Sequence, residues 1–125
     1  MRAIAFFAAM SVAALWAGQS QAQDAAAGEK VFAKCKACHV VEDDKNKVGP
    51  SLKGVIGRTA GTHADFKYST GMIEAGKAGL VWDDAKLTEY LRAPREMIKG
   101  GKMAFAGLKK DEDLANVIAY LKQFP

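Results

Sequence analysis

The sequence predicts a small all-α domain that is rich in loops and contains three to five short helices. Three observations lead to this prediction. No run of alternating apolar and polar residues is long enough for a β-strand. Apolar residues in the last segment recur at helical spacing, and glycines and prolines divide the rest of the chain into short pieces. The chain has 125 residues, a length that allows one domain.

The composition excludes several classes of protein. Hydrophobic residues make up 50% of the chain and charged residues 26%, which is a globular composition and not a disordered one. The formal net charge of +4 at pH 7 is too small for a dedicated nucleic-acid binder, which needs many phosphate contacts. Two cysteines are too few for a mini-fold held together mainly by disulfides.

The first residues have the pattern of a secretory signal peptide. Arg2 precedes an uncharged apolar run from Ala3 to Ala17, and small residues follow at Ser20 and Ala22. We expect cleavage after Ala22, so that residues 1–22 are a signal peptide and residues 23–125 form the domain. The apolar run is shorter than the roughly 20 residues that a membrane-spanning helix needs. A retained membrane anchor is therefore the weaker interpretation.

The first half of the mature chain predicts one helix and one long loop. A helix is expected from Ala25 to Ala37, with Asp24 as its N-cap. Four glycines together with Pro50 then indicate loops and turns between Val48 and Gly61.

The second half predicts three more helices. A short one covers Ser69 to Gly76, and the next covers Asp84 to Ala93, capped by Asp83 and ended before Pro94. Residues 95–110 are expected to form a loop. The last helix begins with three acidic residues at 111–113, where the helix dipole favours negative charge, and continues with apolar residues at i, i+3, i+4 and i+7.

One motif in the chain carries specific chemistry. Cys35 and Cys38 are separated by two residues, and His39 follows directly. The C-x-x-C-H pattern is that of a c-type haem attachment site, in which two thiols bind the haem covalently through two thioethers and the histidine binds the iron. A thioredoxin-like pair would need a βαβ setting. A zinc site would need four well-spaced ligands, and a simple Cys35–Cys38 disulfide would leave His39 unexplained.

The second axial ligand of the iron would decide the chemistry. An open position would permit reactions with oxygen or peroxide, whereas a filled position restricts the site to electron transfer. The four candidates in the mature chain are Met72, Met97, Met103 and His63. Spacing favours Met103, because it follows two glycines in a long loop far downstream of His39.

At this point the chain resembles the class I cytochromes c, in particular the group of bacterial cytochrome c2 and mitochondrial cytochrome c. The resemblance covers about Gly28 to Leu121. The matching residues are found in the segments 28–32, 35–39, 49–54, 57–58, 66–68, 89–91, 102–107 and 119–121 and at Trp82. It implies the class I cytochrome c fold, with short helices wrapped around one covalently attached haem c.

The resemblance also implies individual roles. His39 and Met103 would be the iron ligands, and Pro50 would offer its carbonyl oxygen to the second ring nitrogen of His39. Tyr90 would hydrogen-bond near the sulfur of Met103. The haem propionates would be held by Arg58, Tyr68 and Trp82.

These inferences together predict a soluble, monomeric, periplasmic carrier of single electrons that is not an enzyme. The resemblance implies a bc1-type complex as donor and an oxidase, a peroxidase or a photosynthetic reaction centre as acceptor. We expect acidic surfaces of these membrane complexes to dock by electrostatic steering near a set of lysines. They are Lys34, Lys36, Lys53, Lys99, Lys102, Lys109 and Lys110.

Two other functions remain as alternatives. A haem enzyme of peroxidase type would need an exchangeable sixth ligand, and it would bind CO or cyanide rapidly. A membrane-tethered carrier would retain the apolar segment at the N-terminus.

Overall fold

Five α-helices and the loops between them make up the computed structural model of the protein, which describes residues 24–125. The helices are α1 (Ala25–Phe32), α2 (Thr70–Lys77), α3 (Asp84–Arg92), α4 (Pro94–Met97) and α5 (Asp111–Leu121). Within this range, the isolated bridge between Thr59 and Val81 is the only strand-like pairing. The prediction of an all-α fold is confirmed, whereas the predicted signal peptide lies outside the described residues.

Short polar side chains fix where three of the helices begin. The carboxylate of Asp24 accepts hydrogen bonds from the N–H groups of Ala26 and Ala27, at 2.9 and 3.1 Å. Asp83 caps α3 in the same way through the N–H of Lys86, at 2.8 Å. The hydroxyl of Ser69 accepts a bond from the third residue of α2 at 3.2 Å. Each cap satisfies an N–H that has no partner inside its helix.

The first helix is shorter than the predicted span of residues 25–37. It ends at Phe32, and the chain continues to Cys38 as a series of turns. The N–H of Cys35 bonds the carbonyl of Phe32, three residues back, at 2.7 Å. This tighter bonding of the final turns is common at helix ends, and the spacing of apolar residues does not reveal it.

Helix α4 lies at the start of the stretch for which the sequence predicts a loop. Pro94 occupies its first turn, where a missing N–H costs nothing and the fixed φ angle suits a helix. The helix is a single turn, too short to show apolar periodicity. The remainder, from Ile98 to Lys110, has no regular secondary structure, as predicted.

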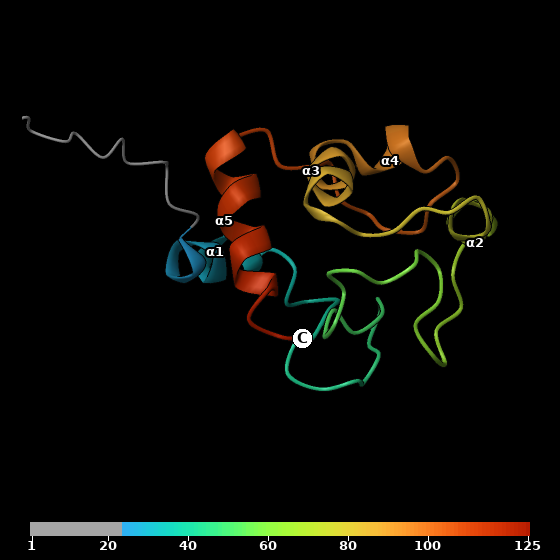
Figure 1. Cartoon of the computed structure of the whole chain (residues 1–125), viewed down its shortest axis with the longest axis horizontal. Helices are drawn as coiled ribbons and strands as arrows, with labels where there is room; N and C mark the ends of the chain where they lie inside the picture. Colours follow the sequence, from blue (N-terminus) through green and yellow to red (C-terminus); the bar gives the residue numbers. More distant parts are fainter. Residues whose placement is uncertain (1–23) are drawn as a thin grey trace, which may run out of the picture.

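The two terminal helices cross at one end of the molecule (Figure 1). Gly28 lies against the backbone of Asn116, so closely that a β-carbon at residue 28 would stand 1.9 Å from the Asn116 carbonyl oxygen. The rings of Phe32 and Tyr120 pack beside this contact, with centroids 5.2 Å apart. Both rings are buried, as is Val117. This crossing therefore depends on the absence of a side chain at residue 28.

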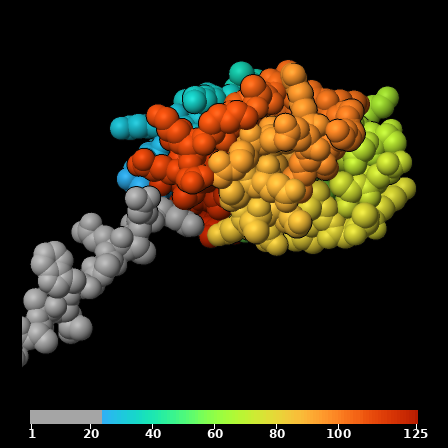
Figure 2. Space-filling view, turned by 90° about the horizontal axis from the view of Figure 1, so that it is seen from above, coloured from blue at the N-terminus to red at the C-terminus, as the bar shows by residue number. Residues whose placement is uncertain are grey.

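Further bonds tie both ends of the described residues to the rest of the fold. The buried side chain of Asn116 accepts a hydrogen bond from the N–H of Asp24 at 2.9 Å. Beyond α5, the carbonyl of Phe124 accepts one from the N–H of Gly54 at 2.7 Å. Figure 2 shows the red C-terminal segment between the blue N-terminal segment and the yellow to orange residues of the second half. In the described part of the chain, no helix has the length and apolar character needed to cross a bilayer.

The helix crossing yields a prediction about stability. Replacing Gly28 with alanine forces α1 and α5 apart, because the new β-carbon meets backbone and not a movable side chain. We expect the Gly28→Ala variant to lose about 1–3 kcal/mol in free energy of unfolding, measured by guanidinium denaturation. Glu29→Ala, at the exposed next position of α1, is the control and should lie near wild type. Equal stability of the two variants would contradict the close crossing.

Candidate functional site

Both cysteines lie on one tight turn that follows α1. The N–H groups of Cys38 and His39 donate to the carbonyl of Cys35, at 3.1 and 2.9 Å. Neither cysteine forms a disulfide, and both are half-buried. Burial, with a smaller effect of Cys38, raises the pKa of the Cys35 thiol. The turn therefore presents two free sulfur atoms directly before a histidine.

A single hydrogen bond determines which nitrogen of His39 carries the proton. Nδ1 lies 2.7 Å from the carbonyl oxygen of Pro50. A carbonyl oxygen only accepts, so Nδ1 must donate, and Nε2 of the neutral ring keeps its lone pair. Burial lowers the pKa of His39, partly opposed by this same bond. The ring is thus held neutral, in the tautomer that offers Nε2 to a metal.

Gly49 provides the surface on which the His39 ring rests. A β-carbon at this glycine would stand 2.3 Å from Cε1 of His39 and 2.8 Å from Nδ1. The N–H of Gly49 also donates to the carbonyl of Cys38 at 2.8 Å, which brings the loop against the cysteine turn. Gly49 belongs to one of the segments that carry the family resemblance. Its contact with the His39 ring was not predicted, because no feature of the neighbouring sequence reveals it.

Met103 lies in the loop after α4, beneath a buried tyrosine. The hydroxyl of Tyr90 lies 4.0 Å from the sulfur of Met103, within reach of a weak hydrogen bond. Burial raises the Tyr90 pKa to about 12, so the phenol keeps its proton and remains a donor at neutral pH. Trp82 packs on Tyr90 with ring centroids 4.8 Å apart. Three residues that the sequence analysis selected therefore lie together.

The other candidate axial ligands differ from Met103 in their polar neighbours. Met72 in α2 and Met97 at the end of α4 are half-buried and pack against the hydrophobic core, as Met103 also does. The Nε2 atom of His63 lies 3.2 Å from the carbonyl oxygen of Asp44. Met103 is the candidate whose sulfur has the tyrosine hydroxyl beside it.

A half-buried arginine stands beside a tyrosine in the loop that precedes α2. The guanidinium of Arg58 donates to the carbonyls of Ser51, at 2.9 Å, and Lys53. The pKa of Tyr68 is raised by burial, and the nearby Arg58 charge opposes this change. Among the described residues three ion pairs form, and none includes Arg58. This cation is therefore available to an anionic group.

The predicted docking lysines carry charges that no carboxylate of the described chain neutralises. None of them takes part in the three ion pairs, and six are exposed while Lys53 is half-buried. Two of them bond backbone instead: Lys102 Nζ reaches the carbonyl of Lys67 at 3.2 Å, and Lys109 Nζ reaches that of Arg92 at 3.0 Å. Their positive charge thus remains open to a partner.

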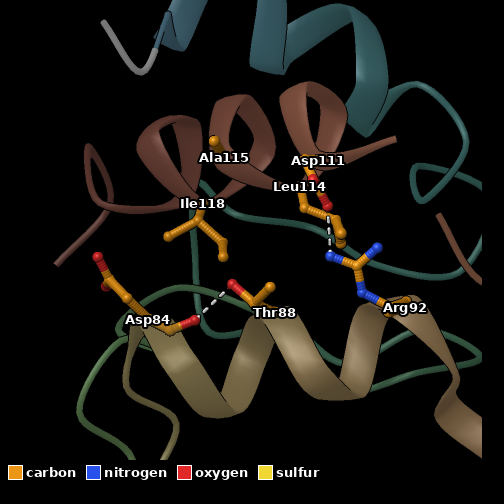
Figure 3. Close-up of a pocket in the computed structure, with 7 residues that line it drawn as sticks. All are labelled: Asp84, Thr88, Arg92, Asp111, Leu114, Ala115 and Ile118. Carbon is orange, nitrogen blue, oxygen red and sulfur yellow. Dashed lines mark hydrogen bonds and ion pairs between the residues drawn. The ribbon is translucent and has the colours of Figure 1, made fainter. Parts of the chain in front are cut away.

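A hollow lies between α3 and α5 (Figure 3). Ion pairs of 2.6 Å join the two helices at Arg92–Asp111 and at Asp84–Lys122. Leu114 and Ile118 line the hollow from α5, and Thr88 lines it from α3. None of the predicted site residues lines it, so we assign it no part in the chemistry.

Asn46 lies close to the site, and the sequence does not predict its role. The side-chain oxygen of Asn46 accepts a hydrogen bond from the N–H of Ser51 at 3.0 Å, and its Nδ2 donates to the carbonyl of Ala64 at 2.9 Å. Asn46 therefore links the loop around Pro50 to the loop before Tyr68. A lone asparagine between charged residues gives no sequence signal for this role.

Known proteins match nearly the whole described chain. Cytochrome c2 of Agrobacterium tumefaciens (strain II Chrys) is 54% identical over 99 residues, which cover 78% of this chain and 89% of the relative. Two solved structures superpose closely. Cytochrome cH from Methylobacterium extorquens has 46% identity and a TM-score of 0.73, covering 80% of this chain and 98% of that one. Ferricytochrome c2 from Rhodopseudomonas palustris has 40% identity and a TM-score of 0.75, covering 82% and 99%.

The sequence model of the family described as Cytochrome c matches residues 25–125, a span that includes the cysteine turn, His39, the Pro50 loop and Met103. Members of this family transport electrons and carry a covalently bound haem c, for which this chain has the two cysteines. The fold, the cysteine turn and these matches agree, and the chain belongs to the cytochrome c family.

Proposed function

We propose that the protein is a periplasmic one-electron shuttle in which His39 and Met103 would be the two side chains that bind the haem iron. The observation that carries this proposal is the state of His39. Its Nδ1 proton is committed to the Pro50 carbonyl at 2.7 Å, which leaves Nε2 as a neutral ligand directly beside two free thiols. When bound, the haem supplies a one-electron Fe(III)/Fe(II) couple.

The surrounding residues fit such a group. Cys35 and Cys38 would hold it covalently, and Arg58 and Tyr68, with Trp82, would hold its propionates. Arg58 supports this assignment, because it is a half-buried cation without a carboxylate partner. The hydroxyl of Tyr90 orients the Met103 sulfur from the side of α3.

The ligand set favours carriage of electrons over catalysis. With one imidazole and one thioether in place, the iron would have no open position for oxygen or peroxide. Thioether ligation and burial both favour Fe(II), which raises the reduction potential relative to two histidine ligands. Both side chains are neutral. The ring of His39 is held by its bond to the Pro50 carbonyl, and the Tyr90 hydroxyl lies 4.0 Å from the Met103 sulfur, so neither side chain would need to move when the iron changed its charge.

Export is part of the proposal. Residues 1–22 would direct the chain to the periplasm and be removed there, leaving residues 23–125 as a monomer. The electron donor would be a bc1-type complex, and the acceptor an oxidase, a peroxidase or a photosynthetic reaction centre. The support for these partners is the set of unpaired lysines, which favours acidic docking surfaces.

The assignment of Met103 as an iron ligand can be tested by replacing single methionines with leucine in the holoprotein. Met103→Leu should abolish the weak near-infrared band of Fe(III)–sulfur charge transfer and open the iron to CO and cyanide. Met97→Leu and Met72→Leu, which alter methionines packed on the core, are the matched controls and should keep the band. Loss of the band in a control variant, or its survival in Met103→Leu, would refute the ligand assignment. Rapid CO binding by wild type would favour the peroxidase alternative.

The close contact between Gly49 and the His39 ring gives a second test. Gly49→Ala adds a methyl group that overlaps the His39 ring, so the ring must tilt away from the Pro50 carbonyl. We expect this variant to lose about 1–3 kcal/mol of stability, as overpacking does, and to show an altered haem spectrum. Gly79→Ala is the control for the spectrum: its φ of 99° makes alanine costly in stability, but its added carbon meets nothing within 4 Å, so its haem spectrum should stay that of wild type. An unaltered spectrum in Gly49→Ala would contradict the proposed position of the ligand.

The docking lysines can be tested by neutralising two of them together. Oxidation of the reduced protein by the anion ferricyanide should slow about two- to tenfold at low ionic strength in Lys36→Gln/Lys99→Gln. The matched control is Lys86→Gln/Lys122→Gln, which also removes two positive charges, from lysines that already lie 3.7 and 2.6 Å from the carboxylates of Glu89 and Asp84, and it should have little effect. The difference should vanish near 1 M salt, where the Debye length is about 3 Å. Equal slowing in the control would show that net charge, and not location, controls the rate.

A further inference from the structure

We propose that Asn46 is a positioning residue that sets the strength of the hydrogen bond between His39 and Pro50. It acts through the peptide group that joins Pro50 to Ser51. This inference rests on the proposed function, because it assumes that His39 is an iron ligand. It adds a residue outside the ligand set that would tune the electron affinity of the site.

The geometry places Asn46 and His39 at the two ends of one peptide group. The carbonyl of Pro50 accepts from Nδ1 of His39 at 2.7 Å. The N–H of the same peptide belongs to Ser51, and it donates to the side-chain oxygen of Asn46 at 3.0 Å. Because a peptide group is planar and conjugated, its two ends are electronically coupled.

This coupling determines the direction of the effect. A hydrogen bond at the N–H end pushes electron density toward the carbonyl oxygen and makes it a better acceptor, by about 10–30% per bond. A better acceptor pulls harder on the Nδ1 proton of His39, and the ring then donates more strongly through Nε2. Stronger donation stabilises Fe(III). Asn46 therefore lowers the reduction potential.

The side chain of Asn46 has one possible orientation. The N–H of Ser51 can only donate, and the carbonyl of Ala64, which lies 2.9 Å from Nδ2, can only accept. The two contacts together leave no choice between the amide oxygen and nitrogen. Asn46 is thus held with its oxygen toward the Pro50–Ser51 peptide.

The peptide itself is held from both sides without help from Asn46. The Ser51 hydroxyl bonds the carbonyl of Asp43 and accepts from the N–H of Lys53 at 3.2 Å, while the carbonyl of Ser51 accepts from Arg58 at 2.9 Å. Ser51 is fully buried. Removing Asn46 should therefore weaken the polarisation of the peptide without releasing the loop.

A second bridge between the same loops supplies a control. The Nε2 atom of His63 lies 3.2 Å from the carbonyl of Asp44, so it joins the two loops without touching the Pro50–Ser51 peptide. If Asn46 served only as a staple between loops, loss of either bridge would have similar effects. If Asn46 acts through the peptide, only its own removal should reach His39.

The experiment compares Asn46→Ala, Asn46→Asp and His63→Ala as holoproteins at pH 8, where free histidine is neutral. The readouts are the reduction potential and, in the reduced protein, the NMR shift and solvent exchange of the His39 Nδ1 proton. Asn46→Ala should raise the potential, move the Nδ1 resonance upfield and speed its exchange about two- to tenfold, as expected for a weakened hydrogen bond. Asn46→Asp keeps the acceptor and loses the donor, so its Nδ1 resonance should stay at or downfield of wild type.

Two results would overturn the proposal. One is an Asn46→Ala variant with the potential and Nδ1 resonance of wild type, and the other is a His63→Ala variant that shifts them equally. If Asn46→Ala fails to fold, Asn46→Asp provides the test. That variant keeps a side-chain oxygen to accept from the Ser51 N–H, so an upfield shift of its Nδ1 resonance would overturn the proposal. Failure of the proposed function is distinguishable, since it would appear in wild type as a missing c-type or near-infrared band.

Discussion

The crossing of the first and last helices is the constraint on which the remaining structure depends. Gly28 allows the backbones to touch, and Asn116 adds a side-chain bond to the start of α1. From this point α1 leads directly into the cysteine turn, and the end of α5 reaches the loop after Pro50 through Phe124. One contact between helices thus positions both the thiols and the carbonyl that orients His39.

Local sequence predicted those parts of the fold that local interactions determine. The caps at Asp24 and Asp83 and the acidic start of α5 depend on residues within one turn, and these three helices begin where the sequence predicts. The end of α1 and the existence of α4 were not predicted. Both are single-turn features, and no apolar periodicity distinguishes them from a longer helix or from a loop.

The site divides in the same way. The cysteine turn and His39 are adjacent in sequence, so their chemistry can be read from the motif alone. The resemblance implies roles for Pro50 and Tyr90, whose carbonyl and hydroxyl oxygens lie 2.7 Å from His39 Nδ1 and 4.0 Å from the Met103 sulfur, respectively. The roles of Gly49 and Asn46 could not be predicted. They arise only when the chain folds back on the cysteine turn and brings residues from separate loops within hydrogen-bonding distance.

The terminal crossing also has a consequence for the order of events during folding. Helix α1 and the two cysteines lie far along the chain from α5, the helix on which α1 packs. An isolated helix as short as α1 is only marginally stable in water, so α1 becomes stable only when α5 meets it. Closing a loop of this length adds an entropic cost. The thiols therefore remain accessible until the crossing forms, which leaves an interval for covalent attachment before the fold closes over them.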